Sequence, residues 1–231
     1  MIWIKAVDVE AVKQMSKTID IKKSVYERNE KLAAELNKTL SKKAVFCINI
    51  LGAPGVGKTT SLLQILKKLD SPACVIEGDL ESDIDTQKLK ALGFPAVQIN
   101  TGNACHLDAP IVEEAFAKLS FSNGFLFIEN IGNLVCPAEY MIGEHIKLLI
   151  CAITDGSDKP YKYPIAFEKA DIILLNKCDL INYINFDIDF FNAGVSKLNP
   201  KAPIFIVSGE TGEGFDEVVK WLQDNAKLII A

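Results

Sequence analysis

The octapeptide Gly52-Ala53-Pro54-Gly55-Val56-Gly57-Lys58-Thr59 decides the fold of this chain of 231 residues. An apolar run over 45–51 precedes it, and apolar residues with helical spacing follow over 58–69. A strand, a glycine-rich loop and a helix in this order form a phosphate cradle, because the loop N–H groups and the helix N-terminus point at the same anion. A glycine turn without a ligand would not explain Gly-Lys-Thr at this offset.

Two side chains of this loop are expected to act on the phosphates directly. Lys58 reaches the β- and γ-phosphate oxygens, and the Thr59 hydroxyl is placed to ligate Mg²⁺. The loop backbone supplies the other contacts. We therefore predict that a nucleoside triphosphate is held by Gly52, Gly55, Val56, Gly57, Lys58, Thr59 and Thr60.

From residue 43 onward, short apolar runs rich in β-branched residues alternate with helical patterns, which is typical of βαβ units. This predicts an α/β fold of the P-loop NTPase type, in which a mostly parallel sheet of seven strands has helices on both faces. Parallel strands end at one edge of the sheet, where ligands bind. Strands are expected at 45–51, 73–77, 96–99, 124–129, 146–153, 171–175 and 204–207, and helices at 58–69, 86–92, 109–119, 186–198 and 214–224.

The N-terminal segment, 1–43, carries ten Lys and Arg residues against six Asp and Glu residues. Its apolar residues, such as Leu32, Leu36 and Leu40, recur near helical spacing, which predicts an amphipathic helix over 9–40 with a possible break near Asp20. We interpret it as a helical extension that packs on a P-loop domain formed by 44–231 and exposes its lysines, rather than as a dedicated docking helix for a partner.

Composition narrows the functional class. A net charge of −5 and a pI near 5.2 argue against nucleic acid or an anionic membrane as the main partner. The sequence shows no run of 18 apolar residues and no cleavable leader, so we expect a cytoplasmic protein. In that reducing compartment the six cysteines are expected to be thiols, and a special pair would bind metal rather than form a disulfide.

The tetrad Asn176-Lys177-Cys178-Asp179 follows the sixth predicted strand. The Asp179 carboxylate can accept hydrogen bonds from N1–H and the exocyclic amine of guanine, which adenine cannot donate in that pattern. Asn176 can meet the other polar edge of the ring, and the Lys177 stem can stack on its face. Ser208-Gly209-Glu210 follows the last strand and resembles a loop that supports the base through a backbone N–H. Two matches in this order behind a P-loop predict GTP rather than ATP.

A carboxylate beside the phosphates is expected to hold Mg²⁺ or its waters, because Mg²⁺ prefers hard oxygen ligands. The second strand is followed by an acidic run, in which Asp79 is the first candidate and Asp83 the second. The rest of the run is interpreted as a solvated helix start.

A further acid and glycine follow the fourth strand, in Glu129-Asn130-Ile131-Gly132. Many GTPases have Asp-x-x-Gly here, where the acid reaches Mg²⁺ through water and the glycine N–H senses the γ-phosphate. Glu129 is longer than Asp by one methylene, so its role is plausible and its geometry is open. Gly132 is the expected sensor. The predicted catalytic residues are Lys58, Thr59, Asp79, Glu129 and Gly132.

Cys105-His106 and Cys136 lie in loops that leave the same sheet edge. Thiolates with an imidazole suit Zn²⁺ or Ni²⁺ and suit Mg²⁺ poorly. Spacing alone is weak, because a buried cysteine beside a helix cap would give the same pattern. Three ligands leave a metal open to water or to a second chain. The other histidine, His145, is interpreted as a helix-surface residue.

Six segments together resemble the HypB family of nickel-insertion GTPases in [NiFe]-hydrogenase maturation, from about residue 20 to the C-terminus. They are GAPGVGKTT, VIEGDLESDIDTQKL, GFPAVQINTGNACHLDA, FIENIGNLVCPAE, DKPYKYP and LLNKCDL. The resemblance implies a GTPase that dimerises under GTP control, with a nickel or zinc site at the dimer interface formed by Cys105, His106 and Cys136. It also implies hydrogenase maturation partners, including an acceptor of nickel.

The sequence departs from some members of this family in two respects. Its first cysteine, Cys47, lies inside a predicted strand, so the N-terminal cysteine motif of some members is not found. With two histidines in the chain, there is no histidine-rich tract, which argues against bulk nickel storage.

The order of the motifs suggests a mechanism. Gly132 and Cys136 share one loop, so a γ-phosphate contact at one end should move a thiolate at the other. Arg28 is the only arginine, and its place in the N-terminal helix is poor for an arginine finger. Unassisted GTP hydrolysis should therefore be slow, on the order of 10⁻³ s⁻¹.

Three alternatives stay open at this point. A GTPase of the urease accessory type characteristically has Cys-Pro-His where this chain has Cys105-His106. A nucleotide kinase would need an arginine-rich lid. A metal-binding protein with a purely structural GTP would bind nickel independently of the nucleotide.

Overall fold

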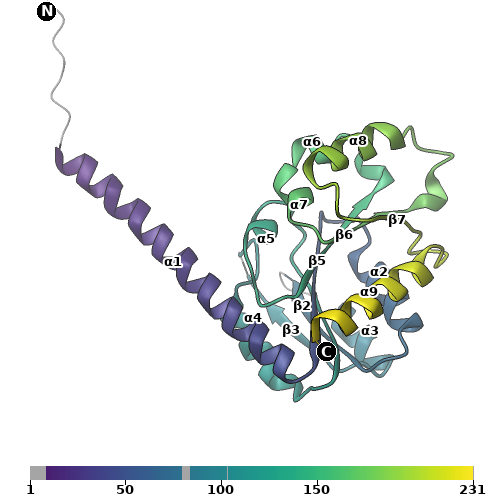
Figure 1. Ribbon diagram of the computed structural model, residues 1–231, viewed down its shortest axis with the longest axis horizontal. Helices are drawn as coiled ribbons and strands as arrows, with labels where there is room; N and C mark the ends of the chain where they lie inside the picture. Colours follow the sequence, from purple (N-terminus) through teal and green to yellow (C-terminus); the bar gives the residue numbers. More distant parts are fainter. Residues whose placement is uncertain (1–8, 80–83, 103, 231) are drawn as a thin grey trace, which may run out of the picture.

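The computed structural model describes residues 9–79, 84–102 and 104–230, arranged as in Figure 1. Seven strands form one sheet in the order β3-β2-β4-β1-β5-β6-β7, and neighbouring strands are parallel. This confirms the predicted α/β sheet. The strands are β1 (Val45–Gly52), β2 (Ala73–Asp79), β3 (Ala96–Asn100), β4 (Gly124–Glu129), β5 (Ile146–Ala152), β6 (Ile172–Asn176) and β7 (Ile204–Ile206).

The long helices lie where the periodicity predicts them, except that α9 continues six residues beyond its expected end at Asp224. They are α1 (Val9–Lys42), α2 (Lys58–Lys68), α3 (Ile84–Ala91), α4 (Ala109–Leu119), α8 (Ile188–Leu198) and α9 (Phe215–Ile230). The sequence did not predict the short elements α5 (Cys136–Glu139), η1 (Ile153–Asp155), α6 (Lys159–Lys162), α7 (Pro164–Glu168) and η2 (Cys178–Leu180). A single turn is too short to show a period, although α5, α6 and α7 each have a proline in the first turn.

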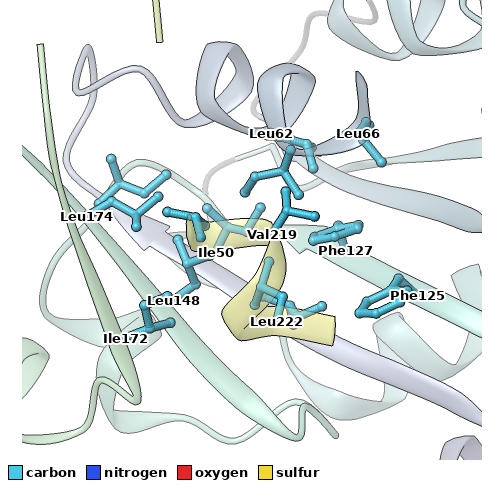
Figure 2. Close-up of a cluster of buried hydrophobic side chains, with 14 of the residues drawn as sticks. Ile50, Leu62, Leu66, Phe125, Phe127, Leu148, Ile172, Leu174, Val219 and Leu222 are labelled. Carbon is cyan, nitrogen blue, oxygen red and sulfur yellow. The ribbon is translucent and has the colours of Figure 1, made fainter. Parts of the chain in front are cut away.

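Both faces of the sheet are covered. Alternate residues of β1 point to opposite faces, so Phe46, Ile48 and Ile50 pack under α2 and α9, as Figure 2 shows for Ile50. Cys47 and Leu51 point to the other face, where α1 and α4 cover one part and α7 and α8 the other. All eight residues of β1 are buried, as expected for a central parallel strand.

Helix α1 runs from Val9 to Lys42 without the break considered near Asp20. Figure 1 shows that its N-terminal part extends away from the sheet, while its C-terminal part lies beside α4. Ala33, Leu36 and Leu40 are buried there, and the two leucines belong to the same core cluster as α4. Among the described helices, none is both long and apolar enough to cross a bilayer.

The interpretation of His145 as a helix-surface residue is wrong. It lies in the bend before β5, half-buried and stacked on Phe46, with ring centroids 5.4 Å apart. Its Nδ1 accepts the Cys47 N–H at 2.9 Å, so its Nε2 carries the proton and donates to Ser41 Oγ at 2.9 Å. His145 therefore joins the end of α1 to the central strand.

Candidate functional site

The P-loop between β1 and α2 has the backbone geometry of a phosphate cradle. Gly57 caps α2 in the left-handed region, with φ +90°, and a Cβ there would lie 2.6 Å from Asn176 Nδ2. A residue with a side chain would therefore be strained and would collide with the Asn176 amide at the end of β6. Lys58 Nζ lies 3.4 Å from the carbonyl oxygens of both Gly52 and Ala53, folded over the loop. Its ammonium is thus held at the cradle that the sequence predicts.

The acid that ends β4 contacts the Thr59 hydroxyl, the predicted Mg²⁺ ligand, directly. Thr59 Oγ1 donates to Glu129 Oε1 at 2.9 Å, and Glu129 is buried with 9% exposure. The additional methylene of Glu129 thus brings its carboxylate to the hydroxyl. Asp79 is the last residue of β2, two residues beyond Glu77, which pairs with Glu129, and its side chain is not described. Asp83 lies outside the described residues.

Gly132 lies against the P-loop. A Cβ at Gly132 would come within 3.0 Å of Pro54 Cγ and 3.1 Å of Pro54 N, so no larger residue fits without displacing the loop. The next residue, Asn133, forms an isolated antiparallel bridge with Gly52. The loop that leads from β4 to Cys136 is therefore in contact with the phosphate cradle at its beginning.

The residues predicted to recognise guanine line a cavity of about 260 Å³ beside the P-loop. Its walls are Gly57, Thr60, Asn176, Lys177, Asp179, Leu180, Gly209 and Glu210, which brings together the loops after β1, β6 and β7. Asp179 lies in this wall, where it accepts a hydrogen bond from Ser208 Oγ. The predicted residues of this pocket are thus assembled from three separate loops.

Asn176 joins the P-loop to the loop after β7, a structural role that its motif does not predict. It is buried, its Nδ2 donates to Val56 O at 2.8 Å, and its Oδ1 accepts the Gly209 N–H at 2.8 Å. Lys177 Nζ donates to Gly55 O at 2.7 Å. The Gly209 N–H therefore donates to Asn176 and does not point at a bound base. Hydrogen bonds join the loop after β7 to Asn176, and they join Asn176 and Lys177 to the P-loop.

The three predicted soft ligands come together in space. The donor atoms of Cys105, His106 and Cys136 lie within 4.8 Å of one another, and Cys105 Sγ is 3.4 Å from His106 Nδ1. In a tetrahedral site, ligand atoms lie about 3.5–3.8 Å apart, so a small movement of one ligand would complete the geometry. The set fits Zn²⁺ or Ni²⁺ and leaves at least one position open.

The protonation of these ligands follows from their surroundings. Burial lowers the pKa of His106, against the opposing effect of Asp108, so its ring is neutral near pH 7 and can bind a metal. A hydrogen bond with Cys105 raises the pKa of the Cys136 thiol, and burial adds to this. A metal therefore has to displace a proton from this pair of thiols.

Several residues that connect these sites were not singled out from the sequence. Asn133 Nδ2 donates to Cys105 O at 3.3 Å, and its Oδ1 accepts the Val135 N–H at 2.9 Å. The ring of Tyr140 stacks on His106 with centroids 4.1 Å apart. Lys159 shares a cavity of about 180 Å³ with Pro54 and Gly132. The family-like segments contain Asn133 and Lys159, but their spacing carries no signal for these contacts.

A buried polar chain runs beneath the two metal-ligand loops. Asn130 Oδ1 accepts from the Leu107 N–H at 3.4 Å, and its Nδ2 donates to Asn49 Oδ1 at 3.1 Å. Glu144 continues the chain, because it accepts from Asn49 and forms a 2.5 Å ion pair with Lys147. The fold and the site together define a P-loop nucleotide-binding protein with a cluster of soft metal ligands beside its phosphate loop.

Comparison with known proteins agrees with this class. Residues 46–206 match the family described as "CobW/HypB/UreG, nucleotide-binding domain". Hydrogenase maturation factor HypB of Escherichia coli K12 is 41% identical over 208 residues, which cover 89% of this chain and 72% of that protein. Hydrogenase/urease maturation factor HypB of Helicobacter pylori J99 is 35% identical over 216 residues, which cover 91% of this chain and 89% of that protein.

Two crystal structures share the fold. HypB from Helicobacter pylori in complex with nickel has a TM-score of 0.83 and 35% identity, covering 87% of this chain and 95% of that one. Hydrogenase maturation factor HypB from Archaeoglobus fulgidus has a TM-score of 0.81 and 31% identity, covering 87% of this chain and 99% of that one. The chain belongs to the HypB family of hydrogenase maturation factors, which confirms the resemblance drawn from its motifs.

Proposed function

We propose that this protein is a GTP-hydrolysing metallochaperone that delivers nickel during [NiFe]-hydrogenase maturation. The observation that carries the proposal is the closeness of two sites of different chemistry. Cys105, His106 and Cys136 have their donor atoms within 4.8 Å of one another, and the loop that carries Cys136 begins against the P-loop at Gly132. A HypB relative crystallised in complex with nickel supports nickel as the cargo.

The nucleotide end binds GTP with Mg²⁺. Lys58 holds the β- and γ-phosphates, Asp179 selects guanine, and Thr59 ligates Mg²⁺. Glu129 lies 2.9 Å from Thr59, which supports it as an acceptor for the Mg²⁺ shell, together with Asp79. Bound Mg²⁺ neutralises charge that develops on the transferred phosphoryl group. Hydrolysis is slow, because the sole arginine, Arg28, lies on α1.

The metal end is completed by a second copy of the chain. One protomer offers three soft donors, of which Cys105 is exposed and His106 and Cys136 are half-exposed. Such an open site lets donors of a partner protomer enter. GTP then promotes a homodimer that holds nickel, or zinc in its place, and hydrolysis loosens the dimer so that nickel passes to an acceptor protein in the cytoplasm.

The other functions are less consistent with the site. A urease accessory GTPase remains the nearest of them, and the name of the Helicobacter relatives covers urease maturation as well as hydrogenase. A kinase would need an arginine-rich lid, which a chain with one arginine does not offer. If GTP were purely structural, the contact of Gly132 with the P-loop would have no role in metal binding.

The test is a nickel titration of the wild type and of Cys136→Ala, with GDP or a non-hydrolysable GTP analogue, in parallel with mass determination. We expect the wild type to bind nickel at two protomers per shared site and to dimerise with the analogue. Cys136→Ala should keep its guanine-nucleotide affinity and bind nickel at least about 10-fold more weakly. Nickel binding that is the same in both proteins would refute the proposed site.

A further inference from the structure

Helix α1 contacts both segments that carry the proposed metal ligands, through a single side chain. Asn29 Oδ1 accepts the Ala109 N–H at 3.0 Å, and its Nδ2 donates to Met141 O at 2.8 Å. Ala109 begins α4, three residues after His106, and Met141 follows Cys136 by five residues. One buried amide, 7% exposed, therefore joins the two segments from the side of α1.

A second contact from α1 reaches the imidazole ligand through an aromatic ring. Tyr140 stacks on His106, with centroids 4.1 Å apart and planes at 29°. Tyr26 of α1 meets Tyr140 edge-on, with centroids 5.5 Å apart and planes at 68°, and its hydroxyl donates to Glu139 O at 3.3 Å.

Other residues of α1, apart from Asn29 and Tyr26, also attach the helix to the domain. Ala33, Leu36 and Leu40 are buried in the core, and Asn37 Nδ2 donates to the Gly143 and Glu144 carbonyl oxygens at 3.2 and 2.9 Å. The side-chain bonds of Asn37 go only to the loop between Tyr140 and β5. Among the described contacts, the bond to the segment of His106 comes from Asn29.

We propose that α1 is a structural component of the metal site, in which Asn29 and Tyr26 set the distance between the two ligand-bearing segments and the orientation of the His106 ring. The ligand atoms must close from a spread of up to 4.8 Å to about 3.5–3.8 Å. Segments already held together lose less freedom on closing, so the bonds from α1 raise metal affinity. This inference rests on the proposed function, because it takes Cys105, His106 and Cys136 as the ligands.

The same residue type at two positions of α1 provides a matched pair of variants. Asn29→Ala removes the bridge between the two segments, whereas Asn37→Ala removes bonds to one loop only. In the full-length protein, we expect Asn29→Ala to weaken Co²⁺ and Zn²⁺ binding about 10-fold in chelator competition, within the range seen for groups that orient ligands. Asn37→Ala should change it less than about 2-fold. Thermal unfolding should shift by a similar amount in both, and GDP affinity should stay unchanged.

Three further variants give readouts that loss of stability alone would not change. Asn29→Asp can still accept the Ala109 N–H but cannot donate to Met141 O, so it should weaken metal binding like Asn29→Ala. Tyr140→Leu, at a half-exposed position, should fold and should alter the visible Co²⁺ spectrum by releasing the His106 ring. Tyr26→Phe should have a smaller effect of the same kind.

Three outcomes decide the matter. Equal metal affinity in the wild type and Asn29→Ala would overturn the inference, and so would equal losses in Asn29→Ala and Asn37→Ala. If Asn29→Ala did not fold, an unchanged affinity and Co²⁺ spectrum in Tyr140→Leu would overturn it. Failure of the proposed function looks different, because Cys136→Ala would then bind metal as tightly as the wild type.

Discussion

The nucleotide end and the metal end of the sheet edge are built in different ways. In the predicted guanine pocket, Asn176 and Lys177 already bond to the P-loop, and Ser208 bonds to Asp179. At the metal end, the three donors lie up to 4.8 Å apart on two loops, partly exposed. The loops of the first site are already joined by side-chain hydrogen bonds, whereas the donor atoms of the second site still have to come closer together. A preassembled site can drive an adjustable one, which is the order that a GTP-controlled metal site requires.

The largest effect should follow from removing the phosphate-binding cation. Lys58→Ala should lower the GTP hydrolysis rate by at least about 100-fold, because the γ-phosphate loses a cation that stabilises its charge. Nickel affinity of the nucleotide-free protein should not change, since Lys58 contacts the P-loop carbonyl oxygens rather than the thiols. Phosphate release measures the hydrolysis rate, and nickel titration measures the metal affinity. A loss of nickel binding in Lys58→Ala would contradict the separation of the nucleotide site from the metal site.

Asp179→Asn should weaken GTP binding about 100-fold, because an amide cannot accept both guanine donors and two charge-assisted hydrogen bonds are lost. Fluorescent GDP displacement measures the affinity, with Glu210→Gln on the same cavity wall as the control. A protein that still prefers GTP over ATP to the same degree would show that Asp179 does not select the base.

Gly132→Ala addresses the contact between the ends. The new Cβ would lie 3.0 Å from Pro54 Cγ and 3.1 Å from Pro54 N, so the loop should move away from the cradle. We expect GDP affinity within about 2-fold of the wild type, and loss of most of the effect of the GTP analogue on nickel affinity, about 5-fold or more. If the nucleotide still changes nickel affinity to the full extent, coupling does not pass through Gly132.

The smallest effect concerns pH. Burial lowers the pKa of His145 below the ordinary histidine value of 6.5, against the opposing effect of Glu144. The unfolded chain therefore takes up a proton first as the pH falls, so the stabilisation is complete above pH 6.5 and is lost below it. Protonation removes the acceptor of the Cys47 N–H, a hydrogen bond that contributes about 1 kcal/mol.

Chemical unfolding between pH 7.5 and 5 measures this loss. The comparison of the wild type with His145→Asn isolates it from His106, whose pKa burial also lowers. The difference in unfolding free energy between the two proteins should shrink as the pH falls. A constant difference would mean that His145 does not titrate in this range.

The fold followed from the sequence because its signals are local and repeated. The glycine pattern before Lys58, the buried runs and the spacing of helical residues each act within one element, and strand ends agree within two residues. The short helices α5, α6 and α7 were missed, because one turn has no period. The prediction for His145 was wrong, because its bonds to Ser41 and Cys47 join residues that are distant along the chain.

In the candidate site, too, the residues with local sequence signals were predicted and those with long-range contacts were not. Motif residues such as Asp179 and Cys136 were predicted from residue type and order. The residues that connect the motifs were not, because Asn133 bonds to Cys105 and Asn29 to Ala109 through the backbone of the acceptor or donor. A backbone partner leaves no mark of residue type in the sequence. Such contacts emerge only when the loops are placed in space.

The central claim is that the nucleotide sets the affinity of the metal site. The most direct measurement is nickel affinity of the full-length wild type, by chelator competition, saturated once with GDP and once with a non-hydrolysable GTP analogue, at constant pH and protein concentration. Coupling between the two sites predicts affinities that differ by about 5-fold or more. Equal affinities in the two nucleotide states would contradict it.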